Sequence, residues 1–196
     1  MSVADLPIGM IVRRTVVVLL VCLMVWVLGT ALGVFSPPSS MHVVPGDPLP
    51  EFDLSTARNR EKRYTLADFK GTGLLLNFYG KACRACEQES SILRRIYKRY
   101  NGENFKVLGV TSQETRLAAS FLEYHKIPWP TLMDRKVELR GQVGVSSFPT
   151  TIFVGADGLV AGLHKGPLDW KTASNAVEQL IISVRSKQNK ASSAAP

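Results

Sequence analysis

The chain has 196 residues, of which 45% are hydrophobic and 20% charged. This is the balance of an ordinary globular domain with an appendage. Three cysteines are too few for a disulfide scaffold, and a chain of this length buries a core without one. The net charge of +8 is compatible with nucleic-acid binding, but the basic residues are scattered and no nucleic-acid motif accompanies them. We therefore expect no nucleic-acid partner.

The uncharged stretch 15–35 is the first clear pattern along the chain. It is as long as a membrane-spanning helix, which needs about 20 apolar residues, and longer than the apolar part of a secretory signal, which has about 7–15. Arg13 and Arg14 precede it, and the next basic residue is Arg58. The positive-inside tendency then predicts a cytoplasmic segment 1–14 and export of everything after the stretch.

The sequence therefore predicts a retained single-pass anchor at 15–35 in the inner (cytoplasmic) membrane, with the remainder on the periplasmic, extracytoplasmic side. A small-x-small cleavage site at Ala31-Leu32-Gly33 and a twin-arginine signal at Arg13-Arg14 are the alternatives. Both also export the domain. Residues 36–48 are rich in proline and serine and predict an extended linker.

The rest of the chain has the pattern of one α/β domain, predicted at 49–187, followed by a polar, disordered tail at 188–196. Apolar periodicity and turn residues predict its elements. Strands are expected at 51–54, 63–65, 74–79, 105–110, 150–154 and 159–163, and helices at 86–100, 114–125, 136–143 and 169–184. This order predicts a mixed central sheet with flanking helices.

Cys83 and Cys86 form a C-x-x-C motif directly after the buried strand 74–79 and at the start of a helix. A structural zinc site needs four ligands, and the expected exported domain has no other cysteine. A helix N-terminus stabilises an anion, and the thiolate is the nucleophile of disulfide exchange. The position thus favours a redox pair in which Cys83 attacks and Cys86 resolves. Lys81 and Arg84 add positive charge that favours the thiolate.

Pro149 opens the strand 150–154 after a turn of small residues. A proline in this position is a candidate for a cis peptide bond, which usually has a specific structural role. The alternative is a trans-proline that merely begins the strand.

Together these motifs resemble the TlpA/ResA-like family of membrane-anchored thioredoxin-fold thiol–disulfide oxidoreductases, over about residues 49–187. The resemblance implies a thioredoxin-like fold, with the segment between Val110 and Val145 as the family's strand–helix insertion. It implies that Glu89 assists proton transfer to the cysteines. It also implies that Phe148, Pro149 and Thr150 form a cis-proline loop that lies beside the cysteines and pairs with the substrate backbone.

Three positions depart from the family pattern. Ala82 stands where a tryptophan is usual, Arg84-Ala85 where the intervening dipeptide often contains proline, and Ser91 where a proline is common. These departures leave the redox potential and the substrate preference open, with Arg84 placed to contact the substrate.

The leading hypothesis is a monomeric reductase of exported protein disulfides, such as those met in cytochrome c maturation or copper-site assembly. No cofactor or metal is expected, and the absence of a nucleotide-binding glycine motif points to a membrane protein as electron donor. One alternative is an oxidase or isomerase for an exported enzyme of the methylamine dehydrogenase type. Another is a Cu(I)-handling module, because cysteine thiolates are soft ligands that suit Cu(I). In that module His164 would have to lie near Cys83 to complete the copper site.

Overall fold

The computed structural model describes residues 8–31, 42–102 and 104–193, with side chains at 12–28, 42–102 and 104–189. It divides into two compact units, 1–39 and 40–196. Each unit is described by itself.

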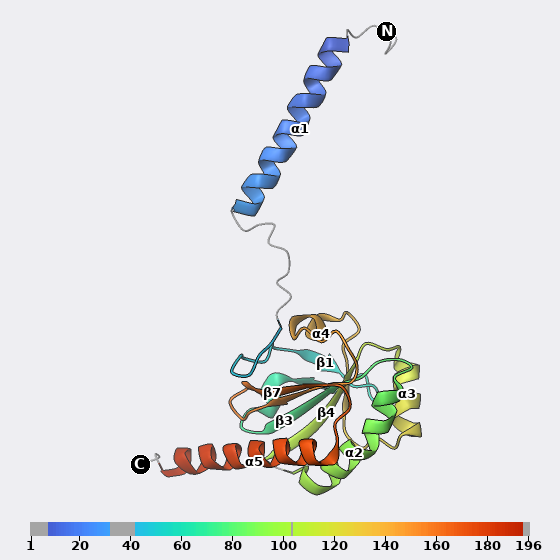
Figure 1. The fold of residues 1–196 in the computed structure, drawn as a ribbon, viewed down its shortest axis with the longest axis vertical. Coiled ribbons are helices and arrows are strands. Elements are labelled where there is room, and N and C mark those ends of the chain that lie inside the picture. The colour runs from blue at the N-terminus through green and yellow to red at the C-terminus, as the bar shows by residue number, and fades with distance from the viewer. Residues whose placement is uncertain (1–7, 32–41, 103, 194–196) are drawn as a thin grey trace. The chain divides into compact units, whose positions relative to one another are not determined.

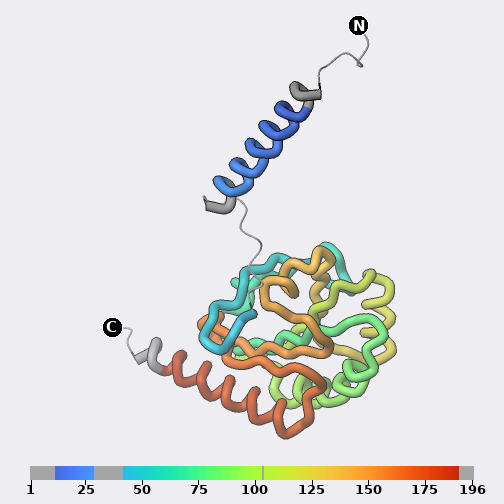
Figure 2. The backbone as a smooth tube through the Cα atoms, turned by 45° about the horizontal axis from the view of Figure 1, so that its top comes forward, coloured from blue at the N-terminus to red at the C-terminus, as the bar shows by residue number. Residues whose placement is uncertain are grey.

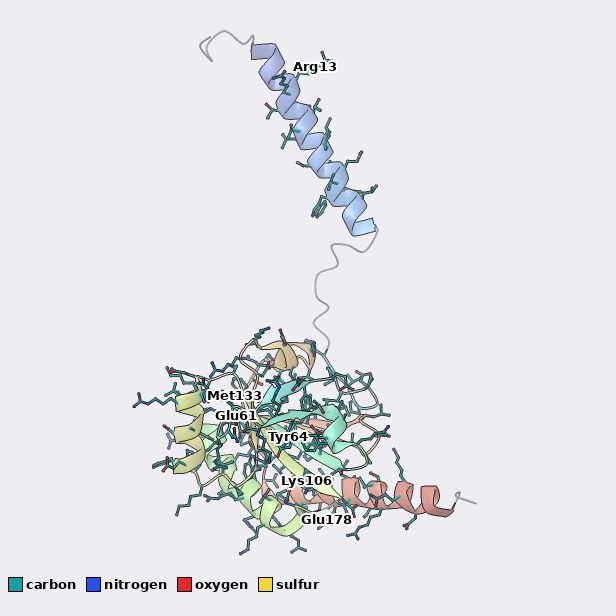
Figure 3. All side chains as sticks on the ribbon, turned by 180° about the vertical axis from the view of Figure 1, so that it is seen from behind. Arg13, Glu61, Tyr64, Lys106, Met133 and Glu178 are labelled. Carbon is teal, nitrogen blue, oxygen red and sulfur yellow. A yellow bond between two sulfur atoms is a disulfide. The ribbon has the colours of Figure 1, made fainter. Side chains whose placement is uncertain are left out.

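The first unit contains helix α1 (Ile8–Ala31), with Arg13 near its N-terminal end (Figure 3). Its apolar side chains from Val12 to Leu28 are exposed. Residues 32–35 of the predicted anchor lie outside the described residues. Among the residues that the structure describes, no helix is both long enough and apolar enough to cross a membrane.

A five-stranded mixed sheet forms the centre of the second unit, in the order β5-β4-β3-β6-β7 (Figure 1). The strands are β3 (Gly73–Phe78), β4 (Phe105–Thr111), β5 (Thr131–Met133), β6 (Thr150–Val154) and β7 (Val160–Lys165). β3, β4 and β5 run parallel, whereas β6 is antiparallel to both β3 and β7. The predicted mixed sheet is therefore confirmed.

A separate two-stranded ribbon precedes the sheet. β1 (Asp53–Ser55) pairs antiparallel with β2 (Arg63–Thr65), so the strands predicted at 51–54 and 63–65 form a hairpin. The 3-10 helix η2 (Leu66–Phe69) follows at once, and Thr65 and Asp68 form a capping box at its start.

The central strands read as apolar runs because both faces of the sheet are covered. Successive side chains alternate between the faces. Leu75, Val107 and Phe153 pack with residues of α2 (Arg84–Tyr100), α3 (Thr115–Tyr124) and α5 (Trp170–Ser193). Leu76 and Leu108 pack on the other face with residues of the hairpin and of α4 (Glu138–Gln142). Tyr100, at the end of α2, also donates a hydrogen bond to Glu178 on α5, and Figure 3 labels Glu178 on that helix.

Two elements differ from the sequence-based prediction. Local pattern did not predict β5, because its three residues follow Pro128 and Pro130 and are too few to show a period. It lies in the segment between Val110 and Val145 where the resemblance implied a strand–helix insertion, and pairing with the end of β4 makes it a strand. α5 continues to Ser193, past the predicted end at 184 and into the segment predicted as a disordered tail. Side chains near its end hold it, since Lys187 pairs with Asp157 and Gln188 donates to the carbonyl of Gly71. Residues 194–196 lie outside the described residues.

Figure 2 shows the red part of α5 running away from the remainder of the folded unit. The N-terminal end of α5 directly follows the loop after β7, and its C-terminal end lies away from that loop.

Candidate active site

The two cysteines lie where β3 passes into α2 (Figure 1). Cys83 is the N-cap of the helix, and its Sγ accepts a hydrogen bond of 3.2 Å from the backbone N–H of Cys86. The pair forms a disulfide with the Cα atoms 5.2 Å apart. Cys83 is half-buried, whereas Cys86 is only 4% exposed. An incoming partner therefore meets Cys83 first, at the positive end of the helix dipole, which stabilises a thiolate.

The loop before the cysteines is held in an uncommon backbone conformation. Ala82 has a φ of 52°, in the left-handed region that costs a non-glycine residue about 1–2 kcal/mol. Arg84, in the first turn of α2, and Lys81 are both exposed. The positive charge that the sequence placed beside the cysteines is therefore on the surface.

Glu89 lies on the buried stripe of α2 that also carries Cys86, Leu93 and Ile96. This spacing of three to four residues turns one face of the helix toward the sheet. Glu89 is 1% exposed, although glutamate is almost never fully buried unless it has partners. Its register therefore sets the carboxyl group inside the domain, one turn along from the resolving cysteine.

Two N–H donors hold the carboxyl group of Glu89. Asn77 Nδ2 donates to Oε2 at 2.8 Å, and the backbone N–H of Leu168 donates to Oε1 at 2.9 Å. Asn77 also donates to Thr151 Oγ1 at 3.0 Å, its partner across the β3–β6 ladder. The carboxyl group is thus fixed by three elements that are far apart in the sequence.

Burial raises the pKa of Glu89 above its ordinary value, and the hydrogen bonds from Leu168 and Asn77 offset part of that rise. A carboxyl group with a raised pKa takes up and releases a proton closer to neutral pH, as a general acid or base must. The chemistry that the resemblance assigned to Glu89 is therefore available at this position.

Pro149 follows a cis peptide bond with Phe148, which decides between the cis and trans alternatives that the sequence left open. The Phe148 ring packs closely against Gly80, in the chain before the cysteines. The contact leaves no room for a side chain there, since a Cβ at Gly80 would lie only 2.3 Å from Phe148 Cδ2. The Arg140 guanidinium covers the same ring, 4.6 Å from its centroid. The cis-proline loop is thus packed directly against the dithiol loop. Thr150 is buried, and its Oγ1 donates to the carbonyl of Ser147.

The structure brings together the predicted residues Cys83, Cys86, Glu89, Phe148 and Pro149. It adds four groups that the sequence analysis did not assign to the site, namely Gly80, Asn77, Arg140 and the N–H of Leu168. Asn77 carried a signal, because a polar residue in a buried apolar strand needs a partner. The others depend on contacts between distant segments, which no local pattern reveals.

His164, the histidine of the Cu(I) alternative, pairs with Thr151 across the β6–β7 ladder. Within the described ranges, no three His, Cys, Asp or Glu side chains gather in a way that would hold a metal ion.

A family model described as the AhpC/TSA family matches residues 45–162, more than half of the chain. The chain belongs to this family. Thiol-disulfide oxidoreductase ResA of Geobacillus thermodenitrificans is 30% identical to it over 159 residues, which are 81% of this chain and 88% of that protein. ResA of Bacillus subtilis is 26% identical over 158 residues, 80% and 85% of the respective chains. These relatives confirm the resemblance to the ResA group.

Solved structures agree in the fold. The exposed lipoprotein thioredoxin Etrx1 of Streptococcus pneumoniae has a TM-score of 0.57 and 26% identity, and the match covers 67% of this chain and all of that one (100%). A secreted thiol-disulfide isomerase of Corynebacterium glutamicum has a TM-score of 0.64 and 21% identity, covering 75% and 96%. The fold is thioredoxin-like, and with its Cys83–Cys86 pair the chain is a thiol–disulfide oxidoreductase.

Proposed function

We propose that this oxidoreductase reduces disulfides in exported proteins, from an anchored position on the extracytoplasmic side of a membrane. The observation that carries the proposal is the asymmetry of the cysteine pair. Cys83 is accessible and caps a helix, while Cys86 is buried behind it on the stripe that holds Glu89. One thiol is thus arranged to attack a partner and the other to finish the exchange.

In the reduced enzyme, the Cys83 thiolate attacks one sulfur of a partner disulfide. A mixed disulfide forms, and the partner's other sulfur leaves as a thiolate that takes up a proton. Cys86 then loses its proton and attacks Cys83 Sγ, which breaks the mixed disulfide and releases the second partner thiol. The partner gains two electrons and two protons, and the enzyme is left with the Cys83–Cys86 disulfide that the structure contains.

Glu89 is the group that we assign to the proton of Cys86. A buried thiol is a poor nucleophile because burial disfavours its thiolate. A carboxylate one helical turn away can accept the proton as the thiol attacks, and return it when the enzyme is reduced again. Asn77 and the Leu168 N–H keep this carboxylate in place.

The anchor is proposed from the sequence of 15–35 and from the exposed apolar side chains of α1. An uncovered apolar helix is stable only against lipid or a partner. An enzyme held at the membrane surface in this way would be re-reduced by a membrane protein that carries its own dithiol.

Trapping tests the proposal. In Cys86→Ser the mixed disulfide on Cys83 is not resolved, so exported proteins should accumulate on the variant in the native host and be released by a reductant. Cys83→Ser is the matched control and should trap nothing. In the wild type, rapid alkylation should find the pair mostly reduced in the cell. A wild-type pair that is mostly oxidised would assign the opposite direction of electron flow, and a Cys86→Ser variant that traps no protein would refute the proposed exchange.

A further inference from the structure

The surface around the dithiol carries four basic side chains, from four segments of the chain. Lys81 precedes Cys83 in the loop after β3, and Arg84 stands between the two cysteines. Lys165 is the β7 partner of Thr150, the residue after Pro149. Arg140 covers the ring of Phe148. We call these four residues the dithiol-side cations.

Contacts with the cis-proline loop place the two cations that are distant in sequence from the cysteines. The backbone N–H of Gly166, next to Lys165, donates to the carbonyl of Pro149 at 2.9 Å. Arg140 is fixed by a 2.9 Å hydrogen bond from its Nε to the carbonyl of Val145, and the ring that it covers rests on Gly80. Both residues thus adjoin the loop that lies beside the cysteines.

The dithiol-side cations have no carboxylate partner among the residues that the structure describes. In the described part of the chain, none of the four takes part in an ion pair. The exposed carboxylates of the same elements and loops are Glu87, Glu138 and Asp169. Glu138 pairs with Lys136, whereas Asp169 accepts hydrogen bonds only from neutral Thr172, so Glu87 and Asp169 keep their charges and the four cations outnumber these two carboxylates.

We propose that the partner segment that docks on this surface is acidic, with aspartate or glutamate residues beside the cysteine that Cys83 attacks. The inference rests on the proposed function and names the class of its substrate. Complementary charge steers a partner toward the site and disfavours partners of like charge. Since Arg140 and Lys165 both adjoin the cis-proline loop, acidic residues that flank the attacked cysteine would meet one or both.

The test compares three synthetic disulfide peptides that share one cysteine-containing core and differ in their flanks, which are glutamates, lysines or serines. The reduced full chain, purified in a non-ionic detergent, is mixed with each peptide. Formation of the Cys83–Cys86 disulfide is followed by quenching with an alkylating reagent. The acidic peptide should react about tenfold faster than the lysine peptide at low ionic strength, where charges act over about 30 Å. The ratio should fall toward one in high salt.

Paired variants assign the effect to the surface. Arg140→Gln combined with Lys165→Gln should lower the ratio of acidic to basic rates at least threefold. The matched control, Lys70→Gln with Arg185→Gln, also removes two positive charges, from the end of η2 and from the second half of α5, and should leave the ratio unchanged. A double variant that slows all three peptides alike and keeps the ratio would show a structural role only, and would overturn the proposal.

The outcomes also separate this inference from the proposed function. If wild-type protein reduces all three peptides at equal rates, the enzyme exchanges disulfides without a preference for acidic partners, and only this inference fails. If the protein reduces none of them, including the neutral serine peptide, the exchange activity itself fails and the inference fails with it.

Discussion

Replacing Asn77 by leucine tests the buried network that holds Glu89. Leucine has the shape of asparagine but no donor, so Asn77→Leu removes the hydrogen bonds to Glu89 Oε2 and Thr151 Oγ1 without opening a cavity. A hydrogen bond to a charged group contributes about 1.5–3 kcal/mol and one between neutral groups about 0.5–1.5 kcal/mol. The variant should therefore lose about 2–4 kcal/mol of unfolding free energy when Glu89 is ionised, and about 1–3 kcal/mol when it is neutral.

The pH dependence is the sharper part of this prediction. The folded protein raises the pKa of Glu89, so the wild type loses stability as the pH rises from the ordinary carboxyl range through that raised pKa. Because the bond from Asn77 lowers this pKa, its removal raises the pKa further. The loss of stability in Asn77→Leu should therefore grow with pH, while its packing effect stays constant.

Urea unfolding of the oxidised protein between pH 4 and pH 9 measures this difference. Thr151→Val is the matched control, because it removes the second hydrogen bond of Asn77 and leaves the bond to Glu89 intact. Its loss of stability, about 0.5–1.5 kcal/mol, should be the same at each pH. An Asn77→Leu loss that does not change with pH would refute the role of Asn77 as a partner of the Glu89 carboxylate.

Three further changes probe the site. Glu89→Gln should slow the resolving step about 100-fold, since general acid–base groups contribute about 10²–10⁴. The rise of its rate with pH in stopped-flow traces should move to higher pH, because the Cys86 thiol must then ionise without the carboxylate; an unchanged profile would remove Glu89 from proton transfer. Gly80→Ala should lower the unfolding free energy by about 1–3 kcal/mol through overpacking, because the added Cβ meets the Phe148 ring. Gly141→Ala is the control, since its Cβ has free space around it, and it should be neutral or stabilising in thermal unfolding. Ala82→Gly, at a φ of 52°, should raise the unfolding free energy by about 1 kcal/mol; a loss of stability would contradict the backbone account.

Local pattern predicted the parts of the fold that strong periodicity marks. The strand 74–79 and the helix that begins at the cysteines follow from an apolar run and an amphipathic stripe. Local pattern missed β5, for which only the resemblance implied a strand, because its partner on β4 is distant in the sequence and three residues carry no period. The end of α5 was placed too early because its last turns are held by contacts with Asp157 and Gly71 and not by an apolar stripe.

The site residues also fall into those that local pattern predicts and those that it does not. The spacing of Cys83 and Cys86 predicts the redox pair, and the position of Pro149 before a strand makes it a candidate cis-proline. The environment of Glu89 is different, since one donor is the backbone of Leu168, from the loop after β7. A backbone N–H leaves no mark in the sequence. The Gly80–Phe148–Arg140 stack likewise joins three segments, and only the tertiary structure shows that they meet.

The central claim is that the two cysteines have different roles, with Cys83 as the attacking thiol. The most direct measurement is to reduce the protein fully, treat it at neutral pH with less than one equivalent of iodoacetamide, and locate the label by peptide mass spectrometry. The account predicts that nearly all of the label lies on Cys83, the half-buried N-cap of α2, while buried Cys86 stays unmodified. Equal labelling of both cysteines, or labelling of Cys86 first, would contradict it.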